Sequence, residues 1–396
     1  MKTLIFKNKI GNSAEIIKNG GIVAVPTETV YGLAANGLDS SAVKKIYEVK
    51  GRPEIKPISL LVSGADDLFR YCIDVPIQAK TLAEHFFPGP LTIILNSSDC
   101  VPSITRAGGE TIGIRCPANE LTLDLIKQAD VPLAAPSANP SGKTSPKSGA
   151  DVINYFNGYI DCIIDNGNCS IGQESTIIDL SKTPYVILRQ GSLPIEKITE
   201  VLLKCVKIIG ITGPTGSGKS TALKIIEANN GLILDCDKIY HSLLDSNAEM
   251  INELKQRFPD SFANDKLDRK KLSSIVFNDT LALADLNKIT HKYVSSEVKK
   301  RIESFAMNGG TLAAIDAVEL ISSGLNNLCT KTVAVISNKE SRLRRIMTRD
   351  GISEKSAEAR IASGRNDDYY ISNCDTFIEN NSTEEDFLNK FSKEVF

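Results

Sequence analysis

The sequence of 396 residues lacks the features that mark several special classes of protein. No apolar run approaches the roughly 18 residues that a membrane-spanning helix needs. The nine cysteines form no C-x-x-C pair and have no nearby histidine at zinc-site spacing, which argues against a disulfide framework or a structural zinc site. Residues 1–9 are charged again before any apolar stretch of signal-peptide length. We therefore expect a cytoplasmic protein with reduced thiols and no membrane association.

An excess of charge of one sign is also missing. Residues 1–204 contain 20 Lys and Arg against 21 Asp and Glu, and the remaining residues contain 26 against 27. Non-specific nucleic-acid binding usually needs a cationic excess, so we expect no direct binding of DNA. The content of 42% hydrophobic and 24% charged residues is ordinary for a soluble globular protein.

One complete phosphate-binding motif is present near the middle of the chain. Residues 213–220 read GPTGSGKS, which matches G-x-x-x-x-G-K-[ST]. The apolar residues 206–212 before it predict a buried strand, and residues 221–228 after it predict a helix. In such a unit, exposed backbone N–H groups and the positive end of the helix surround a phosphate. The residues expected to bind ATP here are Gly213, Gly216, Ser217, Gly218, Lys219, Ser220 and Thr221, with Lys219 reaching the β- and γ-phosphates and Ser220 binding Mg²⁺.

The position of this motif predicts two domains. A P-loop domain begins at its first strand, so the preceding residues need a core of their own. We place the domains at residues 1–203 and 204–396, each long enough to bury a core. Strand and helix signals alternate in both, which predicts the α/β class.

In the first domain, short polar segments follow the predicted strands and helices. Open sheets place ligands at such strand ends. Lys50, Arg52, Lys56 and Arg189 are suited to a polyanion, because guanidinium groups hold phosphates bidentately and ammonium groups neutralise them. The segments are PTETVYGL (26–33), KGRP (50–53), TIGIR (111–115), PSAN (136–139), ESTIID (174–179) and LRQG (188–191).

These segments, in this order, resemble the threonylcarbamoyl-AMP synthase family of YrdC, TsaC and Sua5 type over about residues 10–200. The resemblance implies a twisted α/β sheet with a large positive cavity that binds ATP, L-threonine and bicarbonate. The products would be diphosphate and L-threonylcarbamoyladenylate, which passes to the machinery that makes t⁶A in tRNA. Leu61 and Lys147 depart from the family pattern of a histidine and a hydroxyl residue. Matching positions imply that Thr29, Arg115, Ser137 and Ser175 bind threonine, and that Lys50, Arg52, Lys56, Thr111, Asn139, Ser145 and Arg189 bind ATP.

In the second domain, two aspartates follow the strand predicted at residues 231–234. Asp235 and Asp237 would lie beside the P-loop, where a carboxylate accepts a hydroxyl proton or holds Mg²⁺ through water. The alternative is that Asp237 caps the next helix. Further strands are predicted at 311–316 and 331–336.

Six arginines at helical spacings flank Gly351. They are typical of a mobile lid over phosphates, and a solvated basic helix face is the alternative. The six are Arg342, Arg344, Arg345, Arg349, Arg360 and Arg365.

Residues 206–391 resemble dephospho-CoA kinase of the CoaE type. The resemblance is carried by the P-loop, DCDK (235–238), LDR (267–269), ITH (289–291), Asp316 and IEN (378–380). It implies a parallel sheet with a helical lid, and transfer of the γ-phosphoryl group of ATP to the 3′-hydroxyl of dephospho-CoA. Asp237 would be the base, Arg345 and Arg349 would belong to the lid, and Arg269 would lie on the CoA side. Val318 and Gly364 depart from the usual proline and glutamine.

The sequence therefore predicts a bifunctional transferase, a nucleotidyltransferase joined to a kinase of coenzyme A biosynthesis, with ATP as co-substrate of both and Mg²⁺ as cofactor. Two alternatives stay open at this point. The second domain could phosphorylate another small molecule, such as a nucleoside or nucleotide. The first could be an RNA-binding module.

Overall fold

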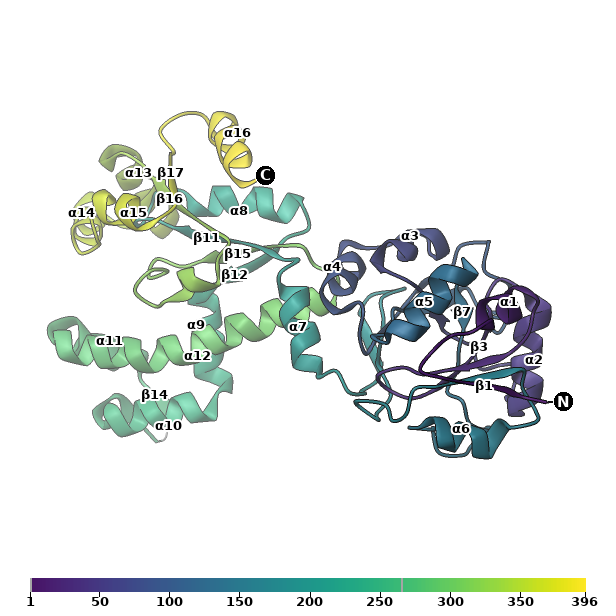
Figure 1. Cartoon of the computed structure of the whole chain (residues 1–396). Coiled ribbons are helices and arrows are strands. Elements are labelled where there is room, and N and C mark those ends of the chain that lie inside the picture. Colours follow the sequence, from purple (N-terminus) through teal and green to yellow (C-terminus); the bar gives the residue numbers. More distant parts are fainter. Residues whose placement is uncertain (1, 265) are drawn as a thin grey trace. The chain divides into compact units, whose positions relative to one another are not determined.

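The computed structural model describes residues 2–264 and 266–396, and the chain divides into two compact units. One unit comprises Met1–Cys205 with Met307–Gly309, and the other comprises Val206–Ala306 with Gly310–Phe396. Met1, where the predicted first domain begins, lies outside the described residues. Each unit is an α/β structure, as predicted, with helices packed on a central sheet (Figure 1).

The first unit contains a mixed ten-stranded sheet with the order β1-β8-β2-β3-β7-β4-β6-β5-β9-β10. Four neighbouring pairs are parallel, namely β1 with β8, β2 with β8, β4 with β6 and β5 with β9, and the other five are antiparallel. The strands are β1 (Leu4–Lys7), β2 (Val23–Val25), β3 (Gly32–Asn36), β4 (Leu60–Leu61), β5 (Leu91–Asn96), β6 (Thr111–Arg115), β7 (Leu133–Ala134), β8 (Cys162–Asp165), β9 (Thr176–Asp179) and β10 (Val186–Arg189). The helices are α1 (Ser13–Lys18), α2 (Ser40–Lys50), α3 (Leu68–Tyr71), α4 (Ile77–Phe86), α5 (Glu120–Ala129), α6 (Gly149–Phe156) and α7 (Ile195–Leu203).

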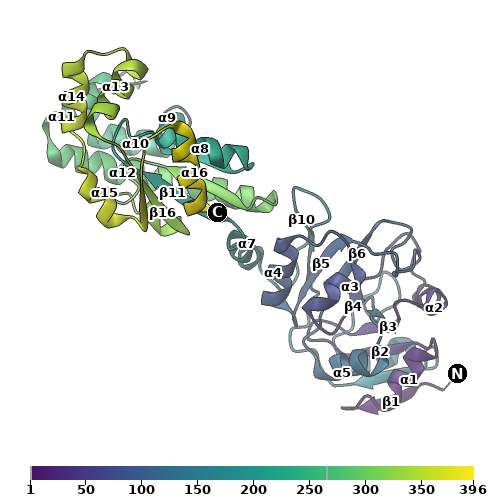
Figure 2. The same cartoon turned by 90° about the horizontal axis from the view of Figure 1, so that it is seen from above.

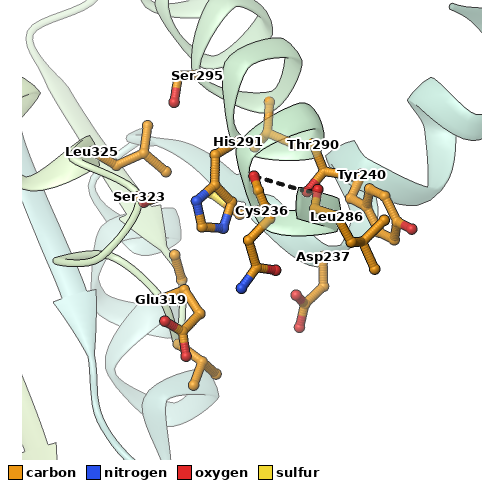
Figure 3. Close-up of a pocket in the computed structure, with 14 residues that line it drawn as sticks. Cys236, Asp237, Tyr240, Leu286, Thr290, His291, Ser295, Glu319, Ser323 and Leu325 are labelled. Atoms are coloured by element: carbon orange, nitrogen blue, oxygen red, sulfur yellow. Dashed lines mark hydrogen bonds between the residues drawn. The ribbon is translucent and has the colours of Figure 1, made fainter. Parts of the chain in front are cut away.

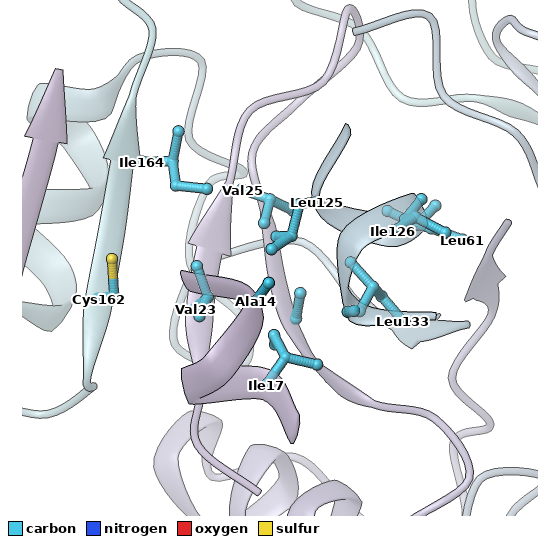
Figure 4. Packing of buried hydrophobic residues seen from close by; sticks show 12 residues of the cluster. Ala14, Ile17, Val23, Val25, Leu61, Leu125, Ile126, Leu133, Cys162 and Ile164 are labelled. Carbon is cyan, nitrogen blue, oxygen red and sulfur yellow. The ribbon is translucent and has the colours of Figure 1, made fainter. Parts of the chain in front are cut away.

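Helices α1 and α5 lie side by side against this sheet in both views (Figures 1 and 2). Leu125 and Ile126 of α5 are buried with Ile17 of α1 against Val23 and Val25 of β2 (Figure 4). Because helices cover the apolar strands, the polar residues at the strand ends are available to form a ligand-binding site.

The second unit contains a five-stranded sheet of order β12-β15-β11-β16-β17, in which every neighbouring pair is parallel. Its strands are β11 (Lys207–Thr212), β12 (Leu232–Asp235), β15 (Leu312–Asp316), β16 (Lys331–Ile336) and β17 (Thr376–Glu379), and β13 (Phe262–Ala263) pairs separately with β14 (Lys266–Leu267). Its helices are α8 (Lys219–Ala228), α9 (Cys236–Ser246), α10 (Ala248–Arg257), α11 (Arg269–Asn278), α12 (Thr280–Met307), α13 (Lys339–Asp350), α14 (Glu354–Ala362), α15 (Asp367–Asn373) and α16 (Glu384–Val395).

Because all five strands run in one direction, their carboxyl ends share one edge of the sheet. The register pairs Asp235 at the end of β12 with Asp316 at the end of β15. β11 lies next to β15 and leads directly into the phosphate-binding loop. This edge therefore collects the loop and the aspartates. Among the described residues, no helix combines the length and the apolar character needed to cross a bilayer.

Packing of α16 against α8 closes the core of the second unit (Figures 1 and 2). Phe387 and Phe391 of α16 are fully buried there, with ring centroids 6.2 Å apart. They cover Ala222 and Ile226 of α8. The C-terminal helix α16 thus holds in place α8, the helix that follows the phosphate-binding loop.

Truncation of one of these rings should destabilise the second unit. Phe391→Ala is expected to cost ~3–5 kcal/mol, because it removes a buried ring and leaves a cavity. In calorimetry of the whole chain, the transition of this unit should fall by about 10 °C. Lys390→Ala, at the adjacent exposed position, is the matched control. Equal melting of the two variants would contradict the packing described.

Candidate active sites

A cavity of about 290 Å³ lies in the first unit, where several strands and loops end. Its charged lining residues are Arg52, Arg115, Arg189 and Glu174. Its polar lining residues are Thr27, Tyr31, Ser59, Thr92, Ser137 and Ser175. The structure thus brings together Arg52, Arg115, Ser137, Ser175 and Arg189 of the predicted set.

The buried carboxylate of Glu28 fixes the position of the Arg115 guanidinium. Its Nη2 donates to Glu28 Oε1 and to Thr29 Oγ1, both at 2.8 Å. Glu28 Oε2 also accepts from the backbone N–H of Ala118 at 2.9 Å. The Arg115 and Glu28 side chains are only 9% and 6% exposed, so water offers neither charge an alternative partner. Arg115 and Thr29 were predicted together, whereas Glu28 was not among the predicted site residues.

Arg189 is held by the segment that contains Glu174 and Ser175. Its Nη1 lies 2.5 Å from Glu174 Oε2, while its Nε donates to Ser175 O at 2.9 Å and its Nη2 to Ser175 Oγ at 3.1 Å. Ser145 Oγ donates to the other carboxylate oxygen of Glu174 at 2.8 Å. Glu174, another residue that was not predicted, therefore joins Ser145 to Arg189.

Lys50 supports the cavity wall and does not line the cavity. Its Nζ donates to the backbone carbonyls of Ser137 and Asn139, and the side chain is buried. Burial lowers the pKa of Lys50 to about 7. The side chain of Asn139 also bonds to the backbone, since its Nδ2 donates to Pro140 O and Lys143 O. Its Oδ1 is buried and has no hydrogen-bond partner among the described residues.

The remaining predicted residues of this unit are placed differently. Arg52 lines the cavity and donates to the backbone carbonyls of Lys56 at 3.2 Å and Pro57 at 2.9 Å. The side chain of Lys56 is exposed, and Thr111 begins β6 at the end opposite Arg115. Lys56 and Thr111 do not line the cavity. Leu61 lines it with an apolar side chain.

The phosphate-binding loop of the second unit borders a cavity of about 800 Å³. Of the predicted loop residues, Gly213 and Ser217 do not line it. Gly218 has a φ of 99°, and a Cβ atom there would lie 2.1 Å from Asn380 Nδ2. A glycine is therefore required where the backbone turns into α8. The lining residues are Thr215, Gly216, Gly218, Lys219, Ser220, Thr221, Asp235, Asp237, Lys238, His241, Asp316, Ala317, Val318, Arg344, Arg345, Thr348 and Arg349.

Lys219 begins α8, two residues before the predicted start of that helix. Its Nζ donates to Gly213 O at 3.1 Å, which folds the side chain over the loop. Burial lowers the pKa of Lys219, and attraction to Asp316 and Asp237 opposes that effect.

Asp235, Asp237 and Asp316 line the cavity near the carboxyl ends of β12 and β15. Asp235 caps α9 by accepting from the backbone N–H of Lys238 at 3.0 Å, and Asp237 lies in the first turn of that helix. The alternative that Asp237 is the cap is therefore wrong. Asp316 Oδ1 is buried without a hydrogen-bond partner among the described residues, and burial raises the pKa of Asp316 to about 6.

Helices α13 and α14 meet at Gly351, which ends α13 with a φ of 63°. Arg344, Arg345 and Arg349 of α13 line the cavity. Arg345 Nη1 donates to Ser217 O and to Ser337 Oγ, both at 3.1 Å. Three of the six predicted lid arginines therefore line the cavity, and a fourth, Arg342, donates from its Nε to Thr215 O of the loop at 3.0 Å.

A second, smaller pocket of about 210 Å³ adjoins this cavity (Figure 3). Asp237, Ala317 and Val318 line both spaces. His291 of α12 and Asp237 of α9 enter the smaller pocket from different helices (Figure 3). Arg269 lines neither space, because its guanidinium pairs with Asp245 at 3.0 Å.

The burial of Asp316 has a consequence for stability. An acid whose pKa rises on folding binds its proton more tightly in the folded state, so the ionised carboxylate lowers stability above about pH 6. Asp316→Asn should therefore raise the unfolding free energy of the second unit at pH 8, on the order of 1–3 kcal/mol. The gain should shrink as the pH falls from 6 towards 4. Denaturation at pH 8 and pH 4.5 tests this, and a gain that is larger at the lower pH would contradict it.

Comparison with known proteins finds a separate family match in each unit. Residues 15–191 match the Sua5_yciO_yrdC family, described as "Telomere recombination", and residues 207–386 match CoaE, "Dephospho-CoA kinase". A threonylcarbamoyl-AMP synthase of Pyrococcus abyssi is 48% identical over 194 residues, which cover 49% of this chain and 57% of the relative. A putative threonylcarbamoyl-AMP synthase of Methanocaldococcus jannaschii is 37% identical over 182 residues, which cover 46% of this chain and 85% of the relative.

The solved structure of a variant of P. abyssi Sua5 is 30% identical, with a TM-score of 0.50, covering 84% of this chain and 99% of that chain. The chain nevertheless spans only 57% and 56% of the length of the P. abyssi and Bacillus subtilis synthases that it matches. These findings, with the two cavities described, show that the chain belongs to the threonylcarbamoyl-AMP synthase family and that its residues 207–386 form a domain of the dephospho-CoA kinase type.

Proposed function

We propose that the chain is a bifunctional enzyme with two separate ATP sites. The first unit would convert L-threonine, bicarbonate and ATP to L-threonylcarbamoyladenylate and diphosphate. The second would transfer the γ-phosphoryl group of ATP to the 3′-hydroxyl of dephospho-CoA. The observation that carries the first activity is the cavity with three guanidinium groups, and Asp237 at the junction of two pockets carries the second.

In the proposed synthase site, Arg115 would bind the carboxylate of threonine. Glu28 fixes that guanidinium in one orientation, and the hydroxyls of Ser137 and Ser175 would orient the rest of the amino acid. Arg52 and Arg189 would face the triphosphate, which needs positive charge as diphosphate leaves.

The proposed reaction has two steps. The amine of threonine attacks bicarbonate, a C–N bond forms, and water leaves to give a carbamate. A carbamate oxygen then attacks the α-phosphorus of ATP. The bond between the α-phosphorus and the α–β bridging oxygen breaks, and diphosphate is released. Fixed arginines contribute by holding the two substrates in line and by stabilising the departing charge.

Arg52 offers a direct test of this site, because its guanidinium lines the cavity and donates to backbone carbonyls of neighbouring residues. Diphosphate release should require ATP, threonine and bicarbonate together. Arg52→Ala should lower that release by about 100-fold, because a cation at the leaving group is lost. Arg70→Ala, which removes an exposed arginine paired with Asp67, is the control. Turnover without threonine would contradict the synthase proposal.

In the proposed kinase site, the loop amides and Lys219 would hold the β- and γ-phosphates. Ser220 and the unpartnered oxygen of Asp316 fit Mg²⁺, which prefers hard oxygen ligands. No cluster of three or more His, Cys, Asp or Glu that could hold a metal occurs among the described residues, so the phosphates would complete the ligand set. When bound, Mg²⁺ would neutralise charge on the β- and γ-phosphates.

The acceptor would reach the γ-phosphate through the smaller pocket in Figure 3. Asp237 lines both spaces and would accept the proton of the attacking hydroxyl. A P–O bond forms to that hydroxyl while the bond between the γ-phosphorus and the β–γ bridging oxygen breaks, leaving ADP. Arg345 and Arg349 would stabilise the transferred group from α13.

Asp237→Asn should lower dephospho-CoA-dependent release of ADP by about 100-fold or more, because the amide cannot accept the proton. Threonine-dependent diphosphate release by the same preparation should be unchanged. Asp285→Asn serves as the control, because Asp285 pairs with Arg257 and lines neither space. Full kinase activity in Asp237→Asn would overturn the assignment of the base.

A further inference from the structure

Glu174 is the one carboxylate among the described residues that line the cavity of the first unit. It is placed where an anionic substrate would be expected. One oxygen lies 2.5 Å from Arg189 Nη1, and the other accepts from Ser145 Oγ at 2.8 Å. Two oxygens of one planar acid therefore occupy two donors that the resemblance assigns to ATP.

The two acid–arginine pairs of this unit differ in how firmly they are held. The pair of Arg115 and Glu28 is almost fully buried, and Glu28 accepts a further bond from a backbone N–H. The pair of Arg189 and Glu174 is 39% and 38% exposed. A partly exposed ion pair contributes little net free energy, because water competes for both charges. Glu174 is therefore the acid that a polyanion can displace.

Arg189 keeps its position when Glu174 leaves. Its Nε and Nη2 bond to Ser175 through the backbone carbonyl and the hydroxyl. Only Nη1 would lose its partner, and this nitrogen would be free to bind a phosphate oxygen. A phosphate that approached Arg189 with Glu174 still in place would meet a like charge at close range.

We infer that Glu174 is an exchangeable counter-ion, which occupies Arg189 and Ser145 in the empty site and yields to the phosphates of a bound nucleotide. It weakens the binding of ATP and of diphosphate by competing for the same donors, and it thereby favours release of diphosphate. This inference rests on the proposed synthase function.

The test compares nucleotide binding with and without the carboxylate charge. The parent is the whole chain carrying Lys219→Ala, which weakens the second nucleotide site. Binding of α,β-methylene-ATP and of diphosphate is measured by calorimetry. Glu174→Gln keeps the side-chain shape and one acceptor oxygen, and it should tighten both ligands by about fivefold to tenfold, as expected for loss of one competing charge.

Two further variants complete the design. Glu174→Ala should also tighten binding, which guards against a folding defect particular to glutamine. Glu110→Gln, at an exposed glutamate paired with Arg106 in the same unit, should leave both affinities unchanged. Unchanged or weaker binding in both Glu174 variants would overturn the inference alone. Failure of the Lys219→Ala parent to bind either ligand would overturn the proposed synthase site, and the inference with it.

Discussion

A charge removed from water must be paired or hydrogen-bonded, and both sites of this chain are built under that constraint. Arg115 is matched by Glu28, Lys50 by two backbone carbonyls, and Lys219 by the carbonyl of Gly213. Each partner also fixes the direction of the cation. Arg115 and Lys219, which are proposed to bind the threonine carboxylate and the phosphates, are therefore positioned before any substrate arrives, and this reduces the cost of ordering them on binding.

How much of this arrangement could be predicted depends on the range of the interactions. Helix α2 is determined by local signals, because Asp39 caps it and Gly51 ends it within the same short segment. The strand before the phosphate-binding loop followed equally from local pattern. The partners Glu28 and Glu174 could not be found in this way. Glu28 lies 87 residues from Arg115 along the chain, and only the folded sheet brings the two together.

Local patterns also fail where two residues of one type compete for one role. Asp235 and Asp237 both precede the apolar residues of α9, and either one satisfies the pattern of a helix cap. The extended backbone at Asp235, with φ −77° and ψ 104°, decides the matter in the structure. Lys50 gives a similar lesson, because a cation in a phosphate-binding segment was expected to face the ligand. The structure uses it to hold the backbone of Ser137 and Asn139.

The two proposed reactions break different bonds of the same nucleotide, and this difference would explain why the two proposed ATP sites have different architectures. Attack at the α-phosphorus expels diphosphate, so positive charge is needed around the β- and γ-phosphates as a leaving group. Side-chain guanidinium groups such as Arg52 and Arg189 would suit that task, and Glu174 could replace the ligand at Arg189. Transfer of the γ-phosphoryl group needs charge on both sides of the β–γ bridge. In the proposed site, backbone N–H groups, Lys219 and the arginines of α13 would surround that position, and Asp237 would lie on the acceptor side. Neither product is a substrate of the other reaction, so each cavity is adapted to its own phosphorus atom.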